Sequence, residues 1–402
     1  MALVVSHQYW PTPGSASQVL GALVRELMAD DLEVSVLTNA AAERGRGEQQ
    51  GPHGERVLAV AGPETSGVSL KRIVDLAKFA WAVWRHSRRE SPDVVISDAP
   101  PTAAWVAERV ARRKGVPFVY YFSDSWGAAS LGAQSQFARL ANGVLTAIEN
   151  GALRRSHLVV AVTSEMVELA GNAGAKNIIE VRNGVDTLEL QGDDLWYPSA
   201  DERDFFLYAG NAGVVHGAEV FLRASELLWE RGESFDLVFM GYGVTHVDAL
   251  AVKERWGDRM VVLDNQPTHR VAAAFRASAG ALSSLRPNPA YAHARPMKSL
   301  TGAACGAPAI YAGEGDFAEV IAENGLGFVS DWSPEGAATS MKQALELQSS
   351  SKRGVRRSAI RDYALAHFDE RVGAKRVVDA VQDLLNGTTL AAQAENHDGR
   401  DA

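Results

Sequence analysis

Lys298 is the residue of this sequence whose surroundings point most directly to chemistry. It stands in RPMKSLTGAACGAPAIYAGEG, where small residues follow it and the next acid is Glu314. Cationic side chains precede it in LRPNPAYAHARPMK, namely Arg286, His293 and Arg295. Arginine binds phosphate in a bidentate manner and lysine acts as a compact charge, so these residues at a helix start form a candidate diphosphate clamp. The alternative is a solvated basic surface, which the small residues around Lys298 disfavour.

Two loops in the first half of the chain could meet a substrate. WPTPGSAS places Gly14 and Ser15 before a helix, whose unpaired N–H groups suit an anion. The alternative there is a proline-rich turn in which Ser17 caps the helix. FSDSWGAA places Asp124 after a buried strand, where a carboxylate could orient or deprotonate a hydroxyl group. The alternative is a turn-forming aspartate followed by a packed Trp126.

Three loops in the second half carry further candidates. YAGNAGVVHG contains Gly210 and Asn211, which would let the backbone and an amide approach a ligand, unless the glycines serve only a turn. MGYGVTH contains Gly241 but has a histidine where a dinucleotide fingerprint needs its third glycine. We therefore interpret it as a structural turn beside a nucleotide site. LDNQPT offers Asn265 and Gln266 to the edge of a base.

The elements that must position these residues alternate between strands and helices. Apolar runs rich in Val, Ile and Phe begin near residues 2, 32, 93, 117 and 157, and helical patterns separate them. The acidic, irregular stretch 186–204 is expected to be a linker, after which the alternation restarts. This pattern predicts an α/β protein with two Rossmann-like parallel-sheet domains, 1–195 and 196–367, and a disordered tail, 388–402. In such sheets ligands bind beyond the carboxyl ends of the strands.

Composition excludes several classes of protein. The formal net charge of −9 over 402 residues argues against a nucleic-acid partner. The single cysteine, Cys305, excludes an intramolecular disulfide and fits a reducing cytoplasm. The N-terminal apolar run is too short for a signal peptide, and no stretch reaches the roughly 18 apolar residues of a membrane span. No Cys/His spacing indicates a metal, and no Ser/His/Asp order indicates a triad.

One segment, SLKRIVDLAKFAWAVWRHSRRE (69–90), combines charge with aromatic residues. It holds six Lys or Arg against two acids, interleaved with Phe79, Trp81 and Trp84. It could lie on an anionic membrane as a peripheral contact, or touch a lipid-linked acceptor. The commoner arrangement is a core helix with a basic outer face.

Taken together, these loops resemble the family 4 retaining glycosyltransferases, which have the two-domain GT-B fold. The similar branch acts in bacterial exopolysaccharide and antigen synthesis. HQYWPTPGSASQVLGALVRELMADDLEVSVLTN is similar to that branch's start, and EVRNGVDTLEL to its "PNGVD" segment. FFLYAGNAGVVHGAEVFLRASELL resembles its "YAGN, G, QG" segment, and the run containing Lys298 resembles its "PSK, E, MAAGKPV" segment. The resemblance spans roughly residues 2 to 385.

The resemblance implies a nucleotide-sugar donor, usually a UDP-sugar or GDP-mannose, and a hydroxyl acceptor, with no metal and no other cofactor. It implies that Gly14 and Ser15 lie near the donor diphosphate, that Asn211 lies at the phosphates or sugar, and that Lys298 holds the diphosphate. The first domain would bind the acceptor and the second the donor. A last helix, about 368–387, would pack back on the first domain.

The sequence departs from the family pattern at three positions. Relatives carry two glutamates separated by seven residues, the second of which contacts the ribose, and here His293 and Thr301 stand in their places. Ser123 replaces the histidine of a His–Asp pair, whereas Asp124 is kept. We therefore expect a retaining transferase, with a UDP-sugar favoured, acting in polysaccharide, glycolipid or natural-product synthesis. The alternatives are a nucleotide-sugar epimerase of the same fold and a non-catalytic nucleotide-sugar-binding subunit.

Overall fold

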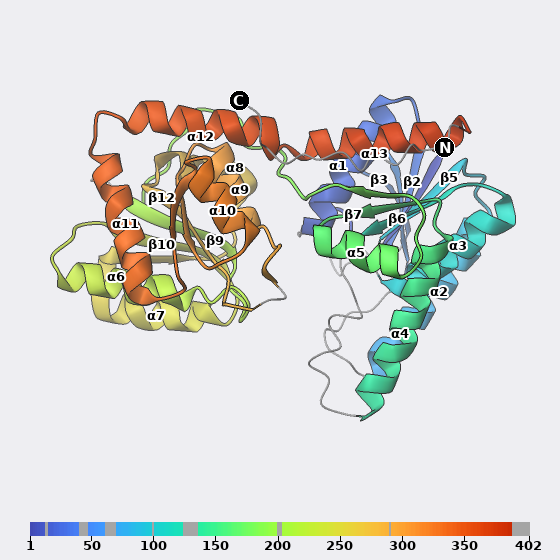
Figure 1. Cartoon of the computed structure of the whole chain (residues 1–402), viewed down its shortest axis with the longest axis horizontal. Coiled ribbons are helices and arrows are strands. Elements are labelled where there is room, and N and C mark those ends of the chain that lie inside the picture. Colours follow the sequence, from blue (N-terminus) through green and yellow to red (C-terminus); the bar gives the residue numbers. More distant parts are fainter. Residues whose placement is uncertain are drawn as a thin grey trace. The chain divides into compact units, whose positions relative to one another are not determined.

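The chain folds into two compact units. The N-terminal unit comprises Met1–Asn183 and the chain from Arg371, and the C-terminal unit comprises Gly184–Glu370. The structure is a computed structural model that describes residues 1–12, 15–39, 47–60, 70–98, 100–123, 136–198, 203–288 and 291–387 (Figure 1). The sequence predicts boundaries after residues 195 and 367, and the structure divides the chain after 183 and 370. The predicted tail, 388–402, lies outside the described residues.

In the described part of the N-terminal unit the strands form an eight-stranded sheet of order β3-β4-β2-β1-β5-β6-β7-β8. Its neighbours pair in parallel except at one edge, where β3 runs antiparallel to β4. The central strands are buried on both faces because helices cover each side. The strands are β1 (Ala2–Ser6), β2 (Val34–Asn39), β3 (Gly47–Gln50), β4 (Arg56–Val60), β5 (Val94–Ser97), β6 (Phe118–Phe122), β7 (Leu158–Ala161) and β8 (Ile178–Glu180).

Two layers of helices cover this sheet. On one face α2 (Leu70–Ser87), α3 (Pro101–Lys114), α4 (Gln136–Arg155) and α5 (Ser164–Asn172) share a core that includes Phe79 and Leu153. On the other face α1 (Ser15–Ala29) packs with α13 (Glu370–Leu385), whose Val377 and Val381 are fully buried (Figure 1). The last helix of the chain therefore completes the first core.

In the described part of the C-terminal unit a six-stranded parallel sheet has the order β11-β10-β9-β12-β13-β14. Numbered from its own first strand this order is 3-2-1-4-5-6, the doubly wound order of the Rossmann fold. The strands are β9 (Phe205–Asn211), β10 (Asp236–Tyr242), β11 (Met260–Leu263), β12 (Gly280–Ser284), β13 (Ala309–Ala312) and β14 (Gly327–Ser330). The helices are α6 (Glu219–Glu230), α7 (Thr245–Trp256), α8 (Thr268–Ala277), α9 (Met297–Ala304), α10 (Asp316–Glu323), α11 (Pro334–Gln348) and α12 (Arg353–His367).

The acidic stretch that sequence predicts to be a linker packs against the C-terminal unit over its described part. Leu190 is buried in that unit's core, and the Trp196 ring meets Phe205 edge-on with centroids 6.1 Å apart. Arg276 of α8 donates hydrogen bonds to the carbonyl oxygens of Leu190 (2.9 Å) and Asp194 (2.8 Å). The linker expectation is therefore corrected here: apolar residues spaced among the acids anchor the stretch to one unit.

Candidate functional site

The strand order of the C-terminal unit places Lys298 where a ligand is expected. The order in which strands are added to the sheet reverses between β9 and β12, and open parallel sheets bind ligands at this switch point, beyond the carboxyl ends of the strands. Lys298 is the second residue of α9, the helix that follows β12. Its ammonium lies 5.0 Å from the centroid of the Tyr208 ring on β9. The side chain thus reaches from one strand-end loop to the neighbouring strand.

Burial shapes the chemistry of Lys298. Desolvation lowers the pKa of its ammonium to about 8, so the group is still mostly charged at neutral pH. Within the described residues no carboxylate forms an ion pair with it. A desolvated cation that faces a ring and lacks a counterion is suited to receive an anionic ligand, which would restore the lost stabilisation of its charge.

The end of β9 provides backbone for that ligand. Gly210 has φ +105°, a conformation that favours glycine, and a Cβ there would lie 3.9 Å from Lys298 Cε. The next residue, Asn211, is exposed, and its carbonyl oxygen accepts a hydrogen bond from the Tyr208 hydroxyl at 2.9 Å. The structure therefore brings Gly210, Asn211 and Lys298 together.

His216 joins this group from the loop after β9. Its pKa is lowered to about 4 by burial and by the charge of Lys298, so the ring is neutral at pH 7. Its carbonyl oxygen accepts a hydrogen bond of 2.6 Å from Ser284 at the end of β12. Its Nδ1 is buried without a hydrogen-bond partner among the described residues. The sequence offers this histidine as a polar group of the loop, but its position beside Lys298 depends on the packing of β9 against β12.

The glycines of MGYGVTH let the backbone at the end of β10 approach the backbone at the end of β9 closely. A Cβ at Gly241 would overlap the carbonyl oxygen of Gly210, and one at Gly243 would lie 2.6 Å from the Ala212 carbonyl carbon. The Ala212 N–H donates to the Tyr242 carbonyl oxygen at 2.7 Å. Close approach of two backbones explains this turn without a dinucleotide.

The arginines of the predicted clamp have other partners. Arg286 forms an ion pair with Glu219 at the start of α6, and its guanidinium lies 4.8 Å from the centroid of the Trp332 ring. The charge of Arg295 acts on Tyr363 of α12. Arg286 is thus paired with a carboxylate, whereas Lys298 has no ion pair with a described residue.

The two positions aligned with family glutamates are also engaged. The imidazole Nδ1 of His293 lies 2.8 Å from Asp316 Oδ2, so an acid is present beside this histidine although it comes from α10. Thr301 Oγ1 donates to the Met297 carbonyl oxygen at 2.9 Å within α9. Its oxygen can still accept a hydrogen bond from a ligand hydroxyl.

The base-edge candidates follow β11, at the edge of the sheet. Asn265 is exposed, and the Gln266 amide donates to the Asp264 carbonyl oxygen at 2.9 Å. They therefore lie beyond the carboxyl end of β11, which β10 separates from β9.

The N-terminal unit gathers polar groups at its own switch point, between β1 and β5. Ser6 Oγ donates to Asp98 Oδ2 at 3.0 Å, and Asp98 is 4% exposed. His7 Nε2 lies 3.4 Å from the Asn39 amide nitrogen. Sequence reasoning missed Asp98, although its place directly after a buried strand was a signal. Gly14 and Asp124 lie outside the described residues, and of Ser15 the structure describes the backbone, as the first residue of α1.

Two absences hold for the parts of the chain that the structure describes. No three His, Cys, Asp or Glu side chains are grouped so that they could hold a metal ion. No helix there is both long and apolar enough to cross a bilayer.

Comparison with known proteins agrees with this architecture. Residues 14–184 match the family model of the glycosyl transferase 4-like domain. No curated protein sequence is similar enough to be a detectable relative. The fold is shared with sucrose-phosphate synthase from Thermosynechococcus elongatus (15% identity, 96% of this chain and 100% of that chain, TM-score 0.74). It is also shared with WaaG, a glycosyltransferase involved in lipopolysaccharide biosynthesis (16%, 95% and 99%, TM-score 0.66).

A third similar structure is the catalytic domain of starch synthase IV from Arabidopsis thaliana, bound to ADP and acarbose (12% identity, 96% of this chain and 99% of that chain, TM-score 0.65). The predicted GT-B fold with two Rossmann-like domains is confirmed by these likenesses. The match of residues 14–184 to the glycosyl transferase 4-like family model agrees with the resemblance of the sequence.

Proposed function

We propose, from the glycosyl transferase 4-like domain and the GT-B fold, that this protein transfers a sugar from a nucleotide diphosphate-sugar to a hydroxyl acceptor with retention of configuration. The observation that carries the proposal is Lys298, a desolvated ammonium without an ion pair among the described residues, at the switch point of a Rossmann-like sheet. A nucleotide diphosphate is the ligand class that matches a single buried cation beside a glycine strand end and a helix start.

In the proposed reaction the acceptor hydroxyl attacks the anomeric carbon from the face that the diphosphate leaves. The glycosidic C–O bond to the diphosphate breaks, the new C–O bond forms, and the acceptor proton passes to the departing phosphate oxygen. Negative charge grows on that phosphate, and a fixed cation in a dry site stabilises it more in the transition state than in the ground state. Lys298 would supply this charge, so the proposed mechanism needs no metal ion.

Neighbouring residues would position the donor. The N–H groups at the start of α9 and the backbone of Gly210 would face the phosphates. His216 is neutral at pH 7, so it would not add a second positive charge to the site. Its Nδ1, which has no partner among the described residues, would form a hydrogen bond with the donor instead. The Thr301 oxygen would accept a hydrogen bond from a ribose hydroxyl. We favour a UDP-sugar, with Asn265 and Gln266 at the base edge.

The acceptor would bind the N-terminal unit. Asp124 remains our prediction for the group that orients its hydroxyl, and Asp98, at the switch point of that sheet, is a second carboxylate for the role. We propose that the acceptor belongs to polysaccharide, glycolipid or natural-product synthesis, with a lipid-linked saccharide as one such substrate.

Calorimetric titration with UDP, GDP and dTDP tests the donor site. Wild type should bind one of them, and Lys298→Ala should weaken that binding by about 10- to 100-fold, the worth of a charged hydrogen bond. Lys253→Ala, which removes an exposed lysine of α7, is the matched control and should bind as wild type. Equal binding by Lys298→Ala would contradict the assignment.

Incubation with a nucleotide sugar alone separates the alternatives. Slow release of free sugar of the same anomeric configuration, detected by proton NMR, is expected of a retaining transferase without acceptor. An isomerised nucleotide sugar would instead identify an epimerase, in which the His293–Asp316 pair would be the acid/base candidate. Tight binding with neither product would identify a non-catalytic subunit.

A further inference from the structure

The helix layer formed by α2, α3 and α4 presents a basic, aromatic outer surface. The inward side of α2 is fixed by Leu76, Phe79 and Val83, which are buried against the first sheet. The opposite side of the same helix therefore faces away from the protein. We call the outward sides of α2 and α3, with the adjoining end of α4, the outer helical face.

Apolar side chains stand exposed on α2 within this face. Val74 and Trp81 lie seven residues apart, which places them on one line of the helix, and their exposed fractions are 46% and 60%. Arg85 and Arg88 flank them, one turn beyond Trp81 and Trp84. The Arg85 guanidinium lies 5.5 Å from the Trp81 ring centroid, and that of Arg88 lies 5.7 Å from the Trp84 ring centroid.

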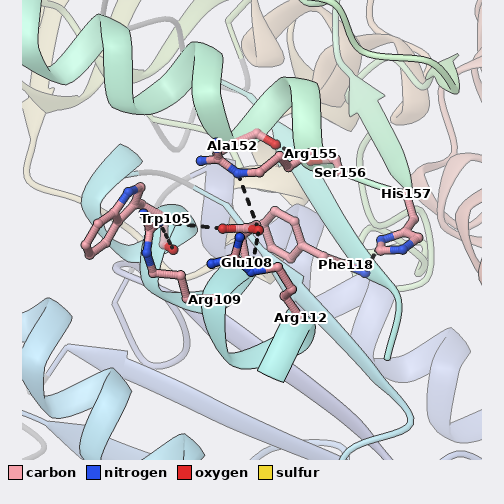
Figure 2. Close-up of polar contacts among 9 residues, drawn as sticks. All are labelled: Trp105, Glu108, Arg109, Arg112, Phe118, Ala152, Arg155, Ser156 and His157. Atoms are coloured by element: carbon pink, nitrogen blue, oxygen red, sulfur yellow. Dashed lines mark hydrogen bonds and ion pairs between the residues drawn. The ribbon is translucent and has the colours of Figure 1, made fainter. Parts of the chain in front are cut away.

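The buried carboxylate of Glu108 on α3 is surrounded by guanidinium groups from α3 and α4 (Figure 2). Glu108 lies 3.5 Å from Arg109, 3.8 Å from Arg112 and 3.4 Å from Arg155 of α4. Arg109 also stacks over Trp105, 3.4 Å from the ring centroid. One carboxylate against three arginines leaves a net positive charge, and the Arg112 side chain is 66% exposed. Glu108 therefore orders the arginines without cancelling their charge.

Cations outnumber acids over the whole outer helical face. Its acids are already paired, Asp75 with Lys78 at 3.3 Å and Glu90 with Arg56 at 2.5 Å. Within the described residues Arg85, Arg88 and Arg89 have no carboxylate partner. These cations also affect the neighbouring His86, whose pKa is lowered first by burial and then by the charges of Arg89 and Arg85. This surface is therefore positively charged, although the net charge of the whole chain is −9.

We propose that the outer helical face docks on an anionic membrane surface. Arginines would meet lipid phosphates, and Trp81 with Val74 would enter the interface between headgroups and acyl chains. A soluble polyanion would satisfy the arginines but would leave a tryptophan and a valine facing water. The helix would lie along the surface, because Leu76, Phe79 and Val83 keep its other side packed in the core of the unit.

Docking this way leaves the strand-end edge of the sheet free. A helix that leads from one parallel strand to the next runs against the strands, so the last turns of α2 and α3 lie at the amino ends of the strands. Arg88, Arg89, Arg112 and Arg113 stand in or directly after those last turns. The outer helical face and the donor site at Lys298 share no residue, so membrane docking can be tested independently of the proposed transferase activity.

Vesicle co-sedimentation of the full chain tests the proposal. Wild type should bind vesicles of phosphatidylcholine mixed with phosphatidylglycerol, bind phosphatidylcholine alone weakly, and lose affinity as salt rises. Arg85→Glu combined with Arg88→Glu should weaken binding by about 30-fold or more, and Trp81→Ser by about tenfold. The matched controls on the C-terminal unit are Arg231→Glu with Lys253→Glu and Val355→Ser, which change exposed residues of the same kinds and should bind as wild type.

Each contrary result overturns the assignment. If wild type does not bind vesicles, or if both sets of face variants bind as wild type does, the outer helical face does not dock on membranes. Loss with the arginine variant but not with Trp81→Ser, together with equal competition by heparin, would assign a soluble polyanion instead of a bilayer. Thermal melting and nucleotide binding measured without vesicles show whether the variants are folded. Failure of the donor site would appear in that nucleotide titration and leave the vesicle result unaffected.

Discussion

The Lys298 ammonium lies over the Tyr208 ring, 5.0 Å from its centroid, in a site where no described carboxylate pairs with it. An aromatic face stabilises a cation by a fraction of what an anion provides. The unliganded protein therefore holds a charge whose stabilisation is incomplete, and several measurable properties follow from that state.

The donor affinity should fall at alkaline pH. Because burial lowers the pKa of Lys298 to about 8, the free protein loses this ammonium as pH rises through 8. We expect kcat/KM for the nucleotide sugar to decline about tenfold per pH unit above that point. In the complex the phosphates raise the pKa of Lys298, so the decline in kcat should begin at higher pH. A pH–rate profile with no alkaline limb between pH 8 and 10 would contradict the role of Lys298.

Lys298→Met should stabilise the unliganded protein while removing activity. The folded-state pKa is below the unfolded value of 10.5, so the charged lysine costs the folded state free energy below pH 8. Its removal is worth up to about 3 kcal/mol at pH 7. Between pH 8 and 10.5 Lys298 of the folded wild type loses its proton, so the free-energy cost of burying its charge disappears. Thermal melting of both proteins at pH 7 and pH 10 measures this, and an equal difference at the two pH values would refute the explanation.

The His216 ring should make the C-terminal unit sensitive to acid. Its folded-state pKa, about 4, lies below the unfolded value of 6.5, so the stability it contributes by being neutral is lost as pH falls from 6.5 toward 4. His216→Gln keeps a polar side chain without this titration. We expect the difference in melting temperature between wild type and variant to change over that pH range and to stay constant from pH 7 to 8.

Gly241→Ala should separate the ends of β9 and β10. A Cβ at this position overlaps the Gly210 carbonyl oxygen, so the backbone must shift, at a cost of about 2–3 kcal/mol. The shift also displaces Gly210 from Lys298 and should weaken nucleotide binding. Gly354→Ala on α12 is the control, because nothing lies within 4 Å of its Cβ, and it should be neutral or slightly stabilising. Similar melting temperatures for the two variants would exclude the close approach.

Glu108→Gln should destabilise the N-terminal unit without affecting nucleotide binding. The substitution leaves three guanidinium groups around a neutral amide, and we expect a loss of about 2 kcal/mol because these arginines are partly exposed. Glu168→Gln changes an exposed glutamate of α5 in the same unit and serves as the control. Denaturant unfolding of both variants gives the difference, and an effect of equal size would show that Glu108 has no special environment.

The sequence was sufficient to predict the architecture and to single out Lys298 as a candidate. Alternating apolar runs and helical patterns predict two parallel-sheet units because burial on both faces requires continuous apolar strands, a local property of the chain. The same reasoning missed β3, β8 and β14, whose residues are polar or only half-buried. It also missed β4, although the residues of that strand are mostly apolar and buried. Lys298 was predicted because an isolated lysine among small residues is itself a local signal.

The tertiary structure decided which neighbours these residues have. Arg286 pairs with Glu219, His293 with Asp316, and Ser6 with Asp98, although each pair is far apart in the chain. Such pairings depend on strand order and on the loops that follow the strands, neither of which a periodic pattern records. Within the predicted clamp, Glu219 pairs with Arg286, whereas Lys298 has no ion pair with a described residue. The charge that a side chain can offer a ligand depends on the charges of its own neighbours.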